Sequence, residues 1–131
     1  MIGLDTNVLV RYIMQDDAKQ SPQATKLMES LDADHQGFVS LVSVVELYWV
    51  LTSCYDLSGQ QVKLVLESLL RTRQIIVDRA DQVLRALRIF DEGKADFADC
   101  LIERTAAAAG CTETVTFDVG AAKHAGMRLM R

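Results

Sequence analysis

Ile2-Gly3-Leu4-Asp5-Thr6-Asn7 brings a short apolar run to an abrupt end on a carboxylate at the start of the chain. The apolar residues that follow, as far as Met14, have helical spacing. A strand that leads directly into a helix is typical of an α/β unit. We therefore expect a short buried strand at residues 2–5 and a helix at residues 6–14.

The same alternation of apolar strands and amphipathic helices continues along the chain. Further strands are expected at residues 37–41, 75–77, 113–117 and 127–130. The helices between them are expected to begin at residues suited to N-capping, namely Ser21, Ser43, Ser58, Asp78 or Asp81, Asp96 and Asp118. This order predicts an α/β fold with a mostly parallel sheet of about four to five strands, covered by helices on both faces.

The composition fits a single domain that comprises residues 1–131. Half of the residues are hydrophobic, at 50%, which is enough to form a core without disulfides. No apolar stretch approaches the roughly 20 residues that cross a bilayer, and Asp5 and Arg11 interrupt the region where a signal peptide would be apolar. We expect a soluble, cytoplasmic protein with no membrane association.

The net charge of -4 argues against a protein that coats nucleic acid by charge alone, because Lys and Arg supply most non-specific affinity for phosphate. It does not exclude a nuclease, since local basic side chains can still contact the backbone. Such side chains are frequent mid-chain, at Arg71, Arg73, Arg79, Arg85, Arg88 and Lys94. A solvated helical face explains them at least as well.

Three later carboxylates lie where a strand ends or a helix begins, as Asp5 does. They are Glu46, Asp99 and Asp118. Ligands of open parallel sheets bind outside the carboxyl ends of the strands, where helix N-termini also point. We therefore expect the four carboxylates to converge at one edge of the sheet.

Helix capping is the competing explanation for each carboxylate taken alone. Ser43 and Glu46 have the spacing of a capping box, and Asp96 and Asp118 can each cap the helix that follows. Capping explains Asp5 less well, because a carboxylate at the end of a core strand needs a partner. The set is therefore more informative than any one member.

Clustered carboxylates repel one another unless a cation or protons neutralise them. Cys54, Cys100 and Cys111 lack the spacing of zinc ligands and are expected to be buried thiols. Oxygen ligands without Cys or His favour Mg²⁺ or Mn²⁺, which activates water to attack a phosphodiester. With two ions roughly 3.5–4 Å apart, the second can stabilise the leaving oxygen.

Four segments together resemble the PIN domain family, in order and at similar separations. They are residues 1–9, 42–47, 95–102 and 114–118, which contain Asp5, Glu46, Asp99 and Asp118. The length is similar to that of VapC-type toxins of bacterial toxin–antitoxin pairs. The resemblance implies a three-layer α/β/α sandwich and a metal-dependent endoribonuclease that inhibits translation as a toxin.

The resemblance also implies the roles of the carboxylates. Asp5, Glu46, Asp99 and Asp118 would be catalytic and bind the metal, with Asp5 and Asp99 as the primary ligands. Glu46 would bind directly or through water, and Asp118 would complete a second or weaker metal position.

Four further residues are expected to support this site, namely Thr6, Asn7, Asp96 and Thr116. Thr116 would hydrogen-bond an acid or a water on the metal, and Asn7 would brace Asp5. Asp96 lies one helical turn before Asp99 on the same face, so a helix cap and a role in the site both fit it, with the cap favoured.

The resemblance implies several partners. These are a second copy of the chain in a homodimer and a cognate VapB-like antitoxin, through which alone the protein would meet DNA. Apolar residues around Leu47, Tyr48 and Leu51 could form the antitoxin groove, although core packing explains most of them better. The RNA substrate would be transfer RNA or ribosomal RNA, between which the sequence does not decide.

Other classes fit less well. A non-catalytic regulatory module with the same fold is an alternative, but all four acidic positions are present. A phosphoacceptor signalling domain has adjacent acids after its first strand, whereas Asp5 is followed by Thr6 and Asn7. A haloacid dehalogenase-type phosphatase would have a second Asp where Asn7 stands.

Overall fold

A computed structural model describes all 131 residues, and it divides into two compact units, Met1–Asp78 and Arg79–Arg131. Each unit is described by itself. None of the helices combines the length and the apolar character needed to span a bilayer. That the two units form a single domain stays a prediction.

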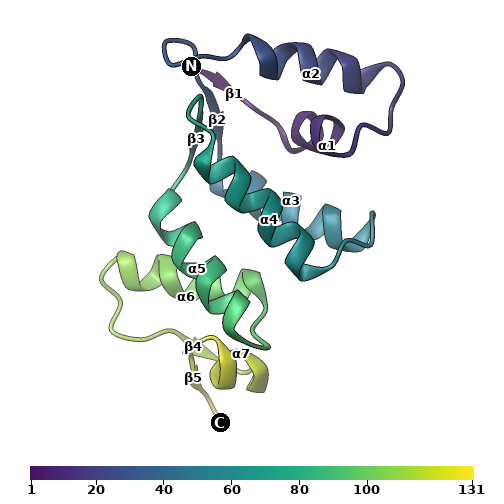
Figure 1. Cartoon of the computed structure of the whole chain (residues 1–131). Coiled ribbons are helices and arrows are strands. Elements are labelled where there is room, and N and C mark those ends of the chain that lie inside the picture. Colours follow the sequence, from purple (N-terminus) through teal and green to yellow (C-terminus); the bar gives the residue numbers. More distant parts are fainter. The chain divides into compact units, whose positions relative to one another are not determined.

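The first unit is a parallel sheet with four helices (Figure 1). Its elements are β1 (Ile2–Gly3), α1 (Thr6–Met14), α2 (Gln20–Ser30), β2 (Gly37–Val39), α3 (Leu41–Ser53), α4 (Gly59–Arg71) and β3 (Ile75–Val77). The three strands lie in the order β1-β2-β3, and Gly37 of the central strand is paired with Ile2 and Ile75. A Cβ atom at Gly37 would lie 2.7 Å from Leu4 Cδ1, so the absence of a side chain allows Leu4 to pack onto the strand.

The core of the first unit consists of aliphatic side chains from every helix and from the sheet. The helices contribute the fully buried residues Leu9, Val44, Leu47, Leu51 and Val62, and β2 contributes Val39. Because Leu47 and Leu51 are buried here, the core-packing explanation of these two residues holds.

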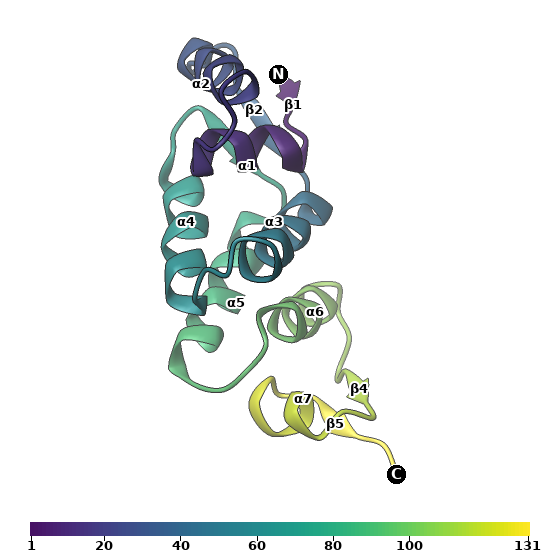
Figure 2. The same cartoon turned by 90° about the vertical axis from the view of Figure 1, so that its right-hand side faces the viewer.

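The second unit has a smaller sheet and three helices. Its elements are α5 (Ala80–Glu92), α6 (Phe97–Ala108), β4 (Val115–Thr116), α7 (Val119–His124) and β5 (Arg128–Leu129). Helices α5 and α6 pack against each other (Figure 2), and the Phe90 and Phe97 rings meet edge to face at 6.1 Å. Strands β4 and β5 pair in parallel.

The α/β fold class with parallel strands is confirmed, and all five expected strands are present. They form a three-stranded and a two-stranded sheet, whereas the sequence predicted one sheet. β1, β4 and β5 are only two residues long, so each makes few ladder hydrogen bonds. Ile2 and Gly3 are exposed and only Leu4 is buried, so the prediction of a buried first strand was wrong.

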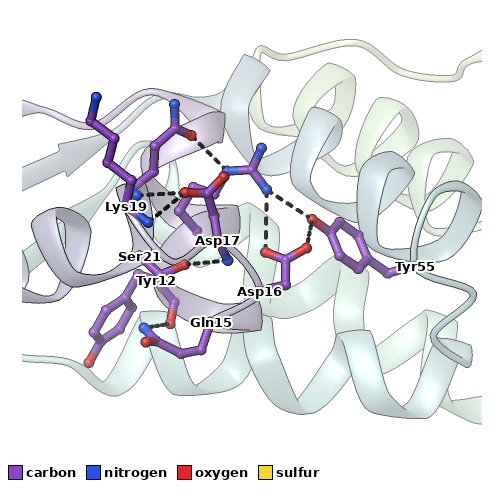
Figure 3. A network of polar contacts seen from close by, with 9 residues as sticks. Tyr12, Gln15, Asp16, Asp17, Lys19, Ser21 and Tyr55 are labelled. Carbon is purple, nitrogen blue, oxygen red and sulfur yellow. Dashed lines mark hydrogen bonds and ion pairs between the residues drawn. The ribbon is translucent and has the colours of Figure 1, made fainter.

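Three of the six predicted helix caps are confirmed, namely Ser58, Asp96 and Asp118. At Ser58, the side chains of Ser58 and Gln61 form a capping box. Ser21 was wrong, because Asp17 upstream accepts bonds from the backbone N–H groups of Lys19 and Gln20, and Ser21 instead accepts one from Asp17 (Figure 3).

Neither acid proposed to cap α5 does so. The N-cap of that helix is Arg79, in the left-handed region at φ 52°, and its side chain makes no capping bond. Asp78 instead accepts a bond from the backbone N–H of Leu41, at the start of α3. Among the cysteines only Cys100 is buried, whereas Cys54 and Cys111 are exposed, which corrects the prediction of three buried thiols.

Candidate functional site

Asp5 lies between β1 and α1 and is the N-cap of that helix. Its Oδ1 accepts a hydrogen bond of 2.9 Å from the backbone N–H of Thr6, and its carbonyl accepts from the backbone N–H of Leu9. The side chain is exposed, so it needs no buried partner. Capping therefore explains Asp5 as well as it explains the other aspartates, contrary to the sequence argument.

Thr6 joins α1 to α3. This residue is 5% exposed, and its Oγ1 donates a hydrogen bond of 2.7 Å to Glu46 Oε1, from a position 40 residues earlier in the chain. The sequence placed Thr6 in a supporting role without a partner. No local pattern identifies such a bond, because it depends on how two helices pack.

Glu46 is not part of the helix cap at the start of α3. Ser40, not Ser43, is the N-cap, and its hydroxyl accepts from the backbone N–H of Ser43 at 3.1 Å. The predicted capping box of Ser43 and Glu46 was therefore wrong by three residues. Glu46 lies beyond the first turn, where its carboxylate can accept the bond from Thr6.

A second link joins the far ends of the same two helices. The Tyr55 hydroxyl, just after α3, donates a bond of 2.7 Å to Asp16, just after α1, as Figure 3 shows. That bond, helped by Arg11 at 3.3 Å, lowers the pKa of Asp16. Together with Thr6 and Glu46, these contacts fix the orientation of α1 against α3.

In the second unit, two aspartates affect the pKa of a third. Asp96 is the N-cap of α6 and accepts a bond of 3.1 Å from the backbone N–H of Asp99, which confirms its predicted capping role. Partial burial raises the pKa of Asp99, and the negative charges of Asp96 and Asp118 raise it further. The Asp99 carboxylate itself makes no hydrogen bond.

Asp118 and Thr116 are linked at the end of β4. Asp118 is the N-cap of α7 and accepts a bond of 2.7 Å from the backbone N–H of Ala121. The Thr116 hydroxyl accepts a bond of 3.0 Å from the backbone N–H of Asp118. Thr116 therefore holds the backbone of Asp118, whereas the sequence predicted a bond to an acid or to water.

The structure thus brings the predicted residues together in two groups, one in each unit. Thr6 bonds both Asp5 and Glu46 in the first unit. Asp96, Asp99 and Asp118, with Thr116, form the second group. Asn7 is exposed and lines a groove beside α2, and it does not bond Asp5 as expected. Neither group brings three potential ligands close enough to hold a metal ion, and the convergence of the two groups stays a prediction.

Comparison with known proteins identifies the family. The family model of the PIN domain matches residues 2–127, which include all four predicted catalytic carboxylates. The chain belongs to the PIN domain family. Members of this family are nucleases that generally depend on a divalent metal ion, so the prediction of a phosphodiester hydrolase is confirmed at this level.

A solved structure is similar to this PIN domain at low identity. It is the VapC20 toxin of Mycobacterium tuberculosis, described as a toxin that cleaves the sarcin–ricin loop. The two share 19% identity with a TM-score of 0.45, over 100% of this chain and 99% of that one. No curated protein is significantly similar in sequence.

The donor groups of this PIN domain fit a hard divalent cation. Asp96, Asp99 and Asp118 offer oxygen atoms, and a cation would relieve both the burial and the neighbouring negative charges that raise the pKa of Asp99. The neighbouring Cys100 is buried, and its pKa is raised to about 11, so its thiol is protonated at neutral pH. The aspartate oxygens, and not this buried thiol, are therefore the donors available to a hard cation.

Proposed function

We propose that this chain is a Mg²⁺- or Mn²⁺-dependent endoribonuclease that acts as the toxin of a toxin–antitoxin pair and inhibits translation. The observation that carries the proposal is the PIN family match, which spans residues 2–127 and includes a complete set of acidic positions. The expected partners are a VapB-like antitoxin, transfer RNA or ribosomal RNA as substrate, and a second copy of the chain.

Asp5 and Asp99 would be the primary metal ligands, with Glu46 binding directly or through water and Asp118 at a weaker position. When bound, the ion makes water more acidic and neutralises charge on the phosphate. The chain itself supplies the orientation of these carboxylates.

Capping and metal binding are compatible in these aspartates, because each cap uses one oxygen only. Asp5 accepts its capping bond at Oδ1, and Asp118 accepts at Oδ2. The second oxygen of each makes no hydrogen bond and stays available to a ligand. A cap bond also restricts the rotation of the side chain, so a capped carboxylate is held ready at little entropic cost.

Glu46 receives the same kind of restraint from a side chain. The Thr6 hydroxyl occupies Oε1 and leaves Oε2 without a hydrogen bond. Thr6 is therefore a positioning residue, whose backbone N–H orients Asp5 and whose hydroxyl orients Glu46.

Cleavage of total cellular RNA by the purified, antitoxin-free protein tests the proposal. We expect discrete cuts with Mg²⁺ or Mn²⁺ that are lost with EDTA and in Asp5→Asn, a variant that can still cap α1. Asp56→Asn is the matched control, because Asp56 is exposed and lies at φ 55°, which Asn tolerates. Absence of cuts, from protein that is folded and stabilised by the metal, would instead favour a non-catalytic binding module.

A further inference from the structure

The two most exposed aromatic side chains lie beside the proposed catalytic carboxylates. Trp49, on α3, is 61% exposed, and Phe117, which directly precedes Asp118, is 78% exposed. Among the other aromatic residues, only Tyr12 is exposed, at 37%. Single exposed aromatic side chains are common on protein surfaces, so the neighbours of each ring decide whether it has a binding role.

Trp49 lies on the same face of α3 as Glu46. The two residues are three apart, which places them side by side on a helix, about 4.5 Å apart along its axis. Val42, four residues before Glu46, is 70% exposed on this face. The opposite face carries Leu47 and Leu51, both fully buried, so Trp49 has no part in that core.

The position of Glu46 indicates which kind of ligand binds the face formed by Val42, Glu46 and Trp49. Val42 and Trp49 flank Glu46, so a protein surface that covered them with apolar contacts would also desolvate the carboxylate, at a cost. A nucleotide avoids that cost, because its phosphate can lie near Glu46 with the cation between them, while its base lies against the adjacent ring.

We propose that Trp49 stacks on an unpaired base of the RNA next to the phosphate that is cleaved, so that α3 supplies a base-binding side chain beside Glu46. This inference rests on the proposed endoribonuclease function. Every base has a π-face that can stack on an aromatic ring, whereas in an A-form duplex the bases are already stacked within the helix. Phe117, the residue before Asp118, offers a second exposed ring in the second unit.

Intrinsic fluorescence tests the proposal directly, because Trp49 is the sole tryptophan. The Asp5→Asn variant is titrated with a single-stranded oligoribonucleotide and with the same sequence in a duplex, with Mg²⁺ present. We expect the single strand to quench the emission of Trp49 and the duplex to leave it nearly unchanged. Equal emission with and without the single strand would overturn the proposal.

Cleavage kinetics on the single strand give a second readout. Trp49→Leu should raise KM roughly tenfold or more, whereas Trp49→Phe, which keeps a ring, should retain most of the affinity. Leu64→Ala is the matched control, because it removes a side chain that is 64% exposed on α4, and it should leave KM unchanged. Circular dichroism verifies that each variant is folded.

The outcomes separate this inference from the proposed function. If the wild-type chain cleaves RNA and Trp49→Leu has an unchanged KM, the stacking role is wrong and the nuclease stands. If the wild-type chain does not cleave but the single strand still quenches Trp49, the nuclease is wrong, and Trp49 is a base-stacking residue of a non-catalytic RNA-binding module. In the absence of RNA, the fluorescence emission of Trp49 should not depend on protein concentration. If it does, this face of α3 is a self-association surface and the proposal is overturned.

Discussion

Thr6 shows how one buried side chain can set the position of a proposed catalytic group. We expect Thr6→Val, which keeps the shape but removes the hydroxyl, to cost about 1 kcal/mol of stability by the loss of one hydrogen bond. Because Glu46 would no longer be held, kcat for RNA cleavage should fall roughly 10- to 100-fold. Urea denaturation and single-turnover cleavage measure the two effects.

Thr6→Ser is the control for this change, since it keeps the donor and loses only a methyl group. It should retain most of the cleavage rate. Equal activity in the valine and serine variants would show that the bond to Glu46 has no part in catalysis.

Asp99 predicts a dependence of stability on pH. Its pKa is raised above the ordinary value of 3.8, by burial and then by the charges of Asp96 and Asp118. The folded chain therefore binds this proton more tightly than the unfolded chain, so stability falls as the pH rises from the ordinary pKa through the folded pKa. Asp99→Asn removes this penalty and should be more stable than the wild type at neutral pH.

The difference between Asp99→Asn and the wild type should vanish below about pH 3.8. Denaturant unfolding at a series of pH values measures it. Mg²⁺ should raise the melting temperature of the wild type more than that of the variant, because binding to the folded state stabilises it. A wild type that is the more stable of the two at neutral pH, without metal, would contradict the argument.

At the scale of a helix, the capping role of Asp118 and its proposed role in metal binding can be tested separately. Helix α7 spans six residues, so the bond from Ala121 to Asp118 satisfies one of its few orphan donors. Asp118→Asn should preserve the cap, whereas Asp118→Ala should cost about 1 kcal/mol. Both variants remove the charge, so both should weaken metal-dependent cleavage.

Thermal melts and cleavage assays of this pair distinguish the two roles of Asp118. A role in capping alone predicts an active Asn variant. We expect Asp118→Ala to lose more stability than Asp118→Asn, and both variants to lose the same activity.

The packing of α1 against α3 rests partly on Tyr55. In Tyr55→Phe, Asp16 loses the bond that contributes most to its lowered pKa, so this pKa should rise toward 3.8. A depressed carboxylate pKa stabilises the fold above the ordinary value, and this stability is lost as the pH falls through the folded pKa. The stability difference between wild type and variant should therefore shrink in acid.

Titration of the Asp16 carboxylate by NMR measures this shift. Asp17, whose pKa is lowered mainly by backbone N–H groups, serves as the internal control and should titrate unchanged. An unaltered pKa of Asp16 would show that its backbone N–H and Arg11 lower the pKa without help from Tyr55.

The elements that the sequence predicted well are those with one strong local signal. The helix at residues 6–14 and the strand at residues 75–77 were predicted with their observed bounds. Ser43 and Ser21 failed as caps because Ser40 and Asp17, a few residues upstream, were equally suitable. Local patterns rank such candidates poorly, since the choice depends on how the helix packs.

In the candidate site, too, features with a local sequence signal were predicted and contacts that depend on packing were missed. Its carboxylates were named from strand ends and helix starts, and capping by Asp96 was confirmed. The bond between Thr6 and Glu46 was missed, because the two residues lie 40 positions apart and no periodicity connects them. The exposure of Asp5 was missed as well, because an apolar run that precedes a carboxylate does not reveal that its first residues face solvent.

At the scale of the whole molecule, the question is whether the two units fold as one. The second unit, Arg79–Arg131, has roughly 50 residues, a size at which a single core is marginal without disulfides or metal. Its sheet has two strands of two residues each, and such a pair is barely stable alone. The family match spans both units, from residue 2 to residue 127.

We therefore expect the chain to unfold in one cooperative transition, as the prediction of a single domain requires. In urea, Trp49 fluorescence follows the first unit, and NMR peaks from amides of α6 follow the second. The two midpoints should coincide, and a fragment of residues 79–131 should show little helix by circular dichroism. Because the second unit holds Asp99 and Asp118, its separate unfolding at lower urea would mean that half of the proposed metal ligands can be lost while the first unit remains folded.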